Sequence, residues 1–138
     1  MVSEDASLEL DAELAPGGLS FVNEALELNS DDNNDPVITL GSIGLVTWTG
    51  PITGNTPTHH VLFPNPGSEL HLNGAISGPG TLQVDALSNA KVVLGGASAN
   101  TYTGGTFVRF GQLHLAKPAG VDAVPGGLVI GDGVGAVS

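Results

Sequence analysis

The chain has 138 residues, with 14 acidic and three basic side chains, 21 glycines, nine prolines and no cysteine. This length fits one domain, and a chain without cysteine has neither disulfides nor thiol chemistry. The formal net charge of −11 argues against nucleic-acid binding, which needs a basic surface, and against attachment to an anionic membrane.

The first part of the chain, residues 1–36, is acidic and holds three short apolar segments. Leu8–Leu10, Leu19–Phe21 and Leu26–Leu28 each alternate an apolar, a polar and an apolar residue, which predicts short strands. Pro16-Gly17-Gly18 interrupts any helix in this region. We therefore expect residues 1–36 to form the acidic N-terminal coils of a single domain, followed by repeat-like coils over 37–138.

An acidic segment, residues 29–36, separates these two parts. Asp31, Asp32, Asn33 and Asp35 concentrate hard oxygen ligands in one loop, as extracellular calcium sites do. The same residue types also favour turns for conformational reasons alone. The sequence thus leaves open a calcium site or a plain turn, and it suggests no other cofactor.

A repeat emerges beyond residue 37. Val46–Gly54 matches Leu70–Gly78 at an offset of 24 residues, and both read apolar-x-apolar-polar-Gly-x-Ile-Ser/Thr-Gly. Extending this match gives two interleaved columns of triplets. The first column begins at Leu8, Leu26, Val46, Leu70, Val92 and Leu113, and the second begins at Leu19, Ile38, Val61, Leu82, Thr106 and Leu128.

Two columns in step predict an all-β fold, a parallel β-helix (β-solenoid) of about six coils of 18–24 residues. Coils stacked about 4.8 Å apart would form a rod roughly 30 Å long. A β-sandwich is the alternative, since it also has short strands and frequent turns. Tyr102 and Ile76 are expected at corners. The expected core is Leu8, Leu10, Leu26, Leu28, Val46, Trp48, Leu70, Leu72, Leu82, Val84, Val92, Leu94, Leu113, Leu115, Leu128 and Ile130.

A longer motif covers residues 70–115. Its regularly spaced residues are Leu70, Leu72, Gly74, Ile76, Gly78, Asn100, Tyr102, Gly104, Thr106, Val108, Gly111, Leu113 and Leu115. This pattern resembles the autotransporter-associated β-strand repeat, also called the passenger-associated transport repeat. The resemblance implies a right-handed parallel β-helix in the passenger of a secreted or surface-displayed bacterial protein, with no catalytic residues in the repeat itself.

Two groups of side chains have residue types that could carry chemistry. Glu9 and Glu27 fall in the same column, so they would lie about 5 Å apart, near the separation of a retaining glycosidase pair. His71 and His114 would lie about 10 Å apart, which is too far for one metal ion, and His59-His60 would point to opposite faces. We expect both groups to be solvated polar positions rather than sites.

The expected function is non-enzymatic: a structural or adhesin-type segment of an extracellular or bacterial cell-surface protein, associating head-to-tail into fibres. Surface glycans or host-cell ligands are candidate partners, and membrane insertion by this segment is not expected. Met1–Asp5 lacks the features of a signal peptide, so the segment is expected to belong to a longer protein. The alternatives are a polysaccharide-binding or polysaccharide-cleaving β-helix and a calcium-stabilised extracellular module.

Overall fold

A computed structural model describes residues 7–10, 18–29, 37–40, 44–55, 58–63, 66–86 and 88–131. These residues form fourteen strands and no helix, and every paired strand runs parallel to its neighbour. In this part of the chain, therefore, no helix crosses a membrane. The all-β parallel solenoid expected from the sequence is confirmed.

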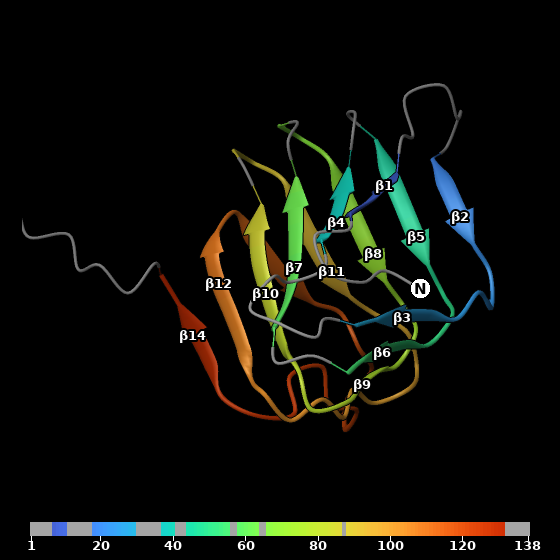
Figure 1. Ribbon diagram of the computed structural model, residues 1–138, viewed down its shortest axis with the longest axis vertical. Coiled ribbons are helices and arrows are strands. Elements are labelled where there is room, and N and C mark those ends of the chain that lie inside the picture. Colours follow the sequence, from blue (N-terminus) through green and yellow to red (C-terminus); the bar gives the residue numbers. More distant parts are fainter. Residues whose placement is uncertain are drawn as a thin grey trace, which may run out of the picture.

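Three parallel sheets form the sides of the solenoid (Figure 1). The first has the order β1-β4-β7-β10-β12-β14, the second β13-β11-β8-β5-β2 and the third β3-β6-β9. The strands of the first sheet are β1 (Ser7–Leu10), β4 (Val37–Leu40), β7 (Thr58–Phe63), β10 (Thr81–Ala86), β12 (Thr106–Phe110) and β14 (Leu128–Ile130). Those of the second are β2 (Leu19–Phe21), β5 (Leu45–Trp48), β8 (Glu69–Leu72), β11 (Lys91–Leu94) and β13 (Gln112–Leu115). Those of the third are β3 (Leu26–Leu28), β6 (Ile52–Gly54) and β9 (Ile76–Ser77).

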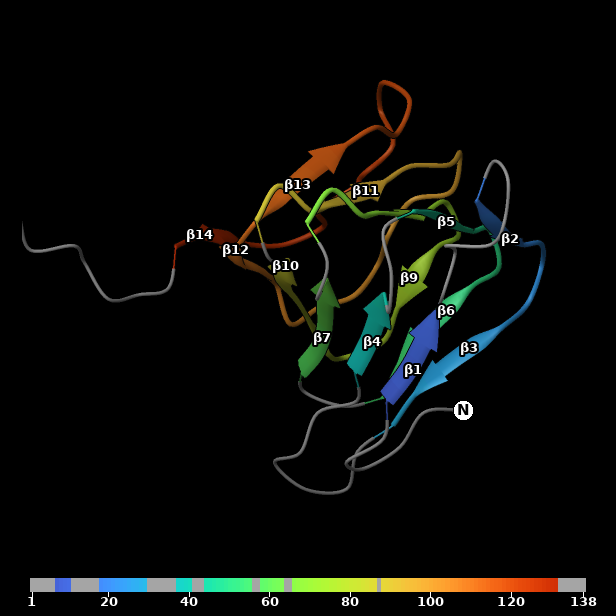
Figure 2. The same ribbon diagram turned by 90° about the horizontal axis from the view of Figure 1, so that it is seen from above.

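The chain visits the sheets in turn, and each of the first three circuits adds one strand to each side. After β9, the described strands join only the first and second sheets. Seen from above, the first sheet runs as a row from β1 at one end to β14 at the other (Figure 2). The five strands of the second sheet bound about four turns, not the six coils expected from the sequence. Six strands spaced about 4.8 Å apart make the first sheet roughly 24 Å wide along the axis.

The 24-residue repeat is confirmed by the strand register. Val46 pairs with Leu70, and Ile52 pairs with Ile76. The wider columns, however, were wrong at their N-terminal ends. Leu19 pairs with Val46, whereas Leu26 pairs with Ile52 in the third sheet.

Two further members of the columns were wrongly aligned. Leu8 pairs with Ile38, and so it belongs to the first sheet. Val61 stays in the first sheet but aligns with Val84 rather than Leu82, a shift of two residues. Leu8 and Leu26 were misplaced because these coils have three sides, each carrying the same apolar-polar-apolar triplet. Triplets alone therefore do not say to which side a strand belongs.

The core fills the space between the sheets, and alternate side chains of each strand point into it. Most of the expected core residues are buried, and Tyr102 and Ile76 are 1% exposed. Ile38, Ile52, Ala86, Ala90 and Val108 are also buried, although the expected core omitted them.

The expected core was wrong at the C-terminal end of the stack. Leu115, Leu128 and Ile130 are 53%, 42% and 76% exposed, and Leu113 is only partly buried. These side chains belong to the last strands of their sheets among the described residues, so no further coil covers them.

Glycine allows the corners of successive coils to approach closely. A Cβ atom on Gly74 would lie far inside van der Waals contact with the carbonyl oxygen of Gly50. A Cβ atom on Gly50 would collide in the same way with the carbonyl of Glu24 in the coil before. Because the obstacle is backbone in both places, no side-chain rotation relieves it.

We therefore predict that Gly74→Ala lowers the free energy of unfolding by about 3 kcal/mol, since the corner must open. Gly126→Ala is the matched control, because the nearest atom to its added Cβ, the Cα of Gly105, lies 3.8 Å away. The control should change stability by less than about 1 kcal/mol. Urea denaturation measures both variants, and equal losses would contradict this account of the corner.

Candidate functional site

The buried corner around Asn100 holds the polar residues of the sequence motif. The Oδ1 atom of Asn100 accepts a hydrogen bond of 2.9 Å from the backbone N–H of Ile76, one coil earlier. Its Nδ2 atom donates a hydrogen bond of 2.8 Å to the carbonyl of Ala123, one coil later. The side chain is 1% exposed, so one amide joins three coils inside the protein.

Asn100 lies where the third sheet stops. The backbone N–H of Thr101 still donates to the carbonyl of Ile76 at 2.8 Å, but the N–H of Ile76 is taken by the Asn100 side chain. The side-chain amide of Asn100 thus takes the place of the backbone carbonyl that a further strand beyond β9 would offer to Ile76. This replacement lets the corner turn without leaving a buried backbone group unpaired.

Tyr102 and Thr106 complete the corner. Both side chains are buried, and their hydroxyl groups hydrogen-bond to each other. Burial raises the pKa of the Tyr102 hydroxyl above 10.0, and the hydrogen bond to Thr106 partly opposes that rise. The tyrosine is therefore neutral at physiological pH, and its buried ring and hydroxyl group stabilise the corner by packing and by the hydrogen bond.

The other motif residues are distributed along the stack rather than gathered at one point. Gly78, Gly104 and Gly111 lie at corners where a Cβ atom would collide with the preceding coil. Leu70, Leu72 and Val108 are buried, Leu113 is partly buried and Leu115 is exposed. This distribution is that of a structural repeat.

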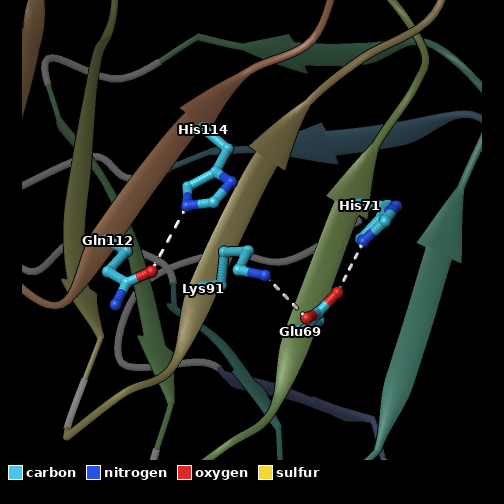
Figure 3. Close-up of polar contacts among 5 residues, drawn as sticks. All are labelled: Glu69, His71, Lys91, Gln112 and His114. Atoms are coloured by element: carbon cyan, nitrogen blue, oxygen red, sulfur yellow. Dashed lines mark hydrogen bonds and ion pairs between the residues drawn. The ribbon is translucent and has the colours of Figure 1, made fainter.

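Polar side chains line the outer face of the second sheet. Glu69 of β8 accepts a hydrogen bond of 2.8 Å from Lys91 Nζ of β11, and its other carboxylate oxygen lies 3.0 Å from His71 Nε2 (Figure 3). The hydrogen bond from Lys91, followed by that with His71, lowers the pKa of Glu69 below 4.5. Both carboxylate oxygens are therefore engaged, and the group remains ionised at neutral pH.

The two Leu-His-Leu triplets are aligned as the sequence predicted. His71 and His114 both pair with Val93, one on each side, so two coil spacings separate them. His114 Nε2 lies 3.2 Å from Gln112 Oε1 on its own strand (Figure 3). Among the described residues, no group of three His, Asp or Glu side chains could hold a metal ion. His59 and His60 lie in β7, but their side chains are outside the described part.

Glu9 and Glu27 do not form a pair. Glu9 lies in β1, where it pairs with Thr39 in the first sheet. Glu27 lies in β3, where it pairs with Thr53 in the third sheet. The predicted proximity of these two residues was wrong because it followed the mistaken column, which joined strands from two different sides.

The calcium candidates Asp31, Asp32, Asn33 and Asp35 lie outside the described residues, so this site stays a prediction. Sequence reasoning missed a different polar contact at Lys117. Its Nζ donates to the carbonyls of Gly95 and Ser98 at 2.5 and 2.7 Å, and burial lowers its pKa. A lone lysine after a strand carries no signal that could have revealed this contact.

Comparison with known proteins does not assign the chain to a family. No family model, no curated protein and no solved structure matches the chain. The resemblance to the autotransporter-associated repeat thus depends on the motif residues alone.

The Asn100 corner generates a stability prediction. Asn100→Ala leaves the N–H of Ile76 and the carbonyl of Ala123 without their side-chain partner, so we expect a loss of about 2–4 kcal/mol. Thr101→Ala is the matched control because that side chain is exposed, and it should cost less than about 0.5 kcal/mol. Thermal and urea unfolding measure both, and an Asn100→Ala variant as stable as the control would refute the role of the amide.

The Glu69 contacts generate a prediction on pH. A carboxyl group whose pKa is lowered in the folded state stabilises that state above its unfolded pKa, and this contribution disappears as the pH falls through the folded pKa. Glu69→Gln should therefore cost about 0.2–1 kcal/mol at pH 7, a small value because the pair is partly exposed to solvent.

The difference between Glu69→Gln and the parent should vanish well below pH 4.5. Urea unfolding of both proteins at neutral and acidic pH tests this. A difference that stays constant across that range would show that ionisation of Glu69 plays no part.

Proposed function

We propose that this chain is a non-enzymatic structural segment of a secreted or surface-displayed bacterial protein, in which it extends a β-helical stalk or adhesin scaffold. The observation that carries this proposal is the exposed C-terminal face of the stack. There Leu115, Leu128 and Ile130 lie in the same ladders as buried residues of earlier coils. The autotransporter-like motif supports the same assignment to the extracellular side.

The edges at this face also favour the addition of another coil. Among the described residues, β13 and β14 end their sheets, so their outer backbone N–H and C=O groups face no strand. Unpaired strand edges are templates for pairing with another chain. Burying the exposed leucines and isoleucine would stabilise such a contact by about 25 cal/mol per Å² of apolar area.

We propose that the occupant is the N-terminal face of a second copy. That face carries β1, β2 and β3, and three apolar side chains of β1 and β2 are only partly buried there: Leu8, Leu19 and Phe21. A contact between two different ends does not close, so it generates a filament. Charge opposes it weakly, because residues 1–69 hold eleven acids and residues 70–138 hold three acids and three bases.

Ile130→Lys tests this function. The side chain is 76% exposed, so the change should leave the fold intact, but it places a charge in the proposed contact. We expect the parent protein to sediment as larger species as its concentration rises, with filaments in negative-stain micrographs. We expect Ile130→Lys to remain monomeric.

Phe107→Ser is the matched control, since it removes an exposed apolar side chain from the lateral surface rather than from the end face. It should assemble like the parent. A parent protein that is monomeric at every concentration reached, or an Ile130→Lys variant that assembles normally, would refute head-to-tail association.

A further inference from the structure

A β-bulge in β12 changes which side chains reach the surface. Val108 pairs with Val84 of β10, yet the next pair joins Phe110 to Asp85, so Arg109 is an extra residue in β12. In a regular strand Phe110 would share the inward face of Val108. The bulge turns it outward instead, and it is 49% exposed while Val108 is 6% exposed.

The bulge brings two aromatic rings to one outer face. Phe107, which is 37% exposed, pairs with Gln83 of β10 and Val129 of β14. Phe107 and Phe110 are three residues apart along β12, a separation of about 10 Å or less at a strand rise of about 3.3 Å per residue. Arg109 lies between them in the sequence.

Polar groups lie beside these rings. Asp85 Oδ2 accepts a hydrogen bond of 3.0 Å from Gln83 Nε2 and lies 3.5 Å from the Arg109 guanidinium. The guanidinium carbon is also 5.7 Å from the centre of the Phe110 ring. The rings are thus bordered by planar hydrogen-bonding groups whose two opposite charges are paired, so the patch has little net charge.

The size of the patch favours a small, flat ligand over a protein. A phenylalanine presents about 150–250 Å², so the two exposed fractions of 37% and 49% amount to roughly 130–215 Å² of phenylalanine surface. A stable protein interface buries about 800 Å² on each partner, which is several times more. The paired charges also give no attraction to a polyanion.

We propose that Phe107, Phe110 and Arg109, with Gln83 and Asp85, form a binding patch for neutral oligosaccharides. Sugar rings present a C–H face that stacks on an aromatic ring and a rim of hydroxyl groups that hydrogen-bond to guanidinium, amide and carboxylate groups. Two rings spaced along one strand fit a ligand of at least two sugar units. The patch lies on the lateral surface, so it stays accessible when coils are added at either end.

Saturation-transfer NMR and calorimetry on the full chain test this site, with cellohexaose, chitohexaose and maltohexaose as neutral probes and polygalacturonate as an anionic one. We expect at least one neutral probe to bind. Phe107→Ala and Phe110→Ala should each weaken binding by about tenfold. Arg109→Lys should also weaken it, because lysine lacks the planar fork of the guanidinium.

Val22→Ala is the matched control, since Val22 is 62% exposed but lies beside β2, on another side of the solenoid. It should bind like the parent. The proposal is overturned if no neutral probe binds, if polygalacturonate alone binds, or if both phenylalanine variants bind normally. Ile130→Lys should retain sugar binding. A failure of sugar binding can therefore be distinguished from a failure of head-to-tail association.

Discussion

The close stacking of one coil on the next is the constraint on which the rest of this structure depends. Parallel strands pair at a spacing of about 4.8 Å, and the corners between them must keep the same distance. That requirement explains why glycine stands at positions such as Gly50 and Gly74, where the added Cβ atom would meet backbone of the coil before. It also explains why polar side chains that enter the interior are hydrogen-bonded there, as Asn100 is to the coils on either side and Thr106 is to Tyr102.

The same constraint gives the solenoid two kinds of surface. Its end faces offer unpaired strand edges and apolar side chains such as Ile130, and these suit the addition of further coils. Its lateral faces consist of alternate side chains that never enter the core, so they are free to vary in chemistry without loss of stacking. The ion pair of Glu69 and Lys91 and the aromatic rings of β12 occupy such lateral positions.

Under the proposals made above, function comes from extension of the solenoid and from display of side chains on its outer surfaces. Elongation would come from the end faces and ligand binding from the lateral ones, and the two would be separable by mutation. The Asn100–Tyr102–Thr106 corner supports both surfaces by holding successive coils in register. Its three side chains are buried and take no part in the outer faces.

The sequence by itself determined the parallel solenoid, the 24-residue repeat and most of the buried ladder, because alternation and spacing are local properties of the chain. Tertiary structure alone decided which side each triplet joins, since Leu8, Leu19 and Leu26 carry the same local pattern but enter three different sheets. It also decided that Glu9 and Glu27 lie apart and that Phe110 faces outward. Those outcomes depend on register between distant strands and on one extra residue in β12, and neither is encoded in a pattern of neighbouring residues.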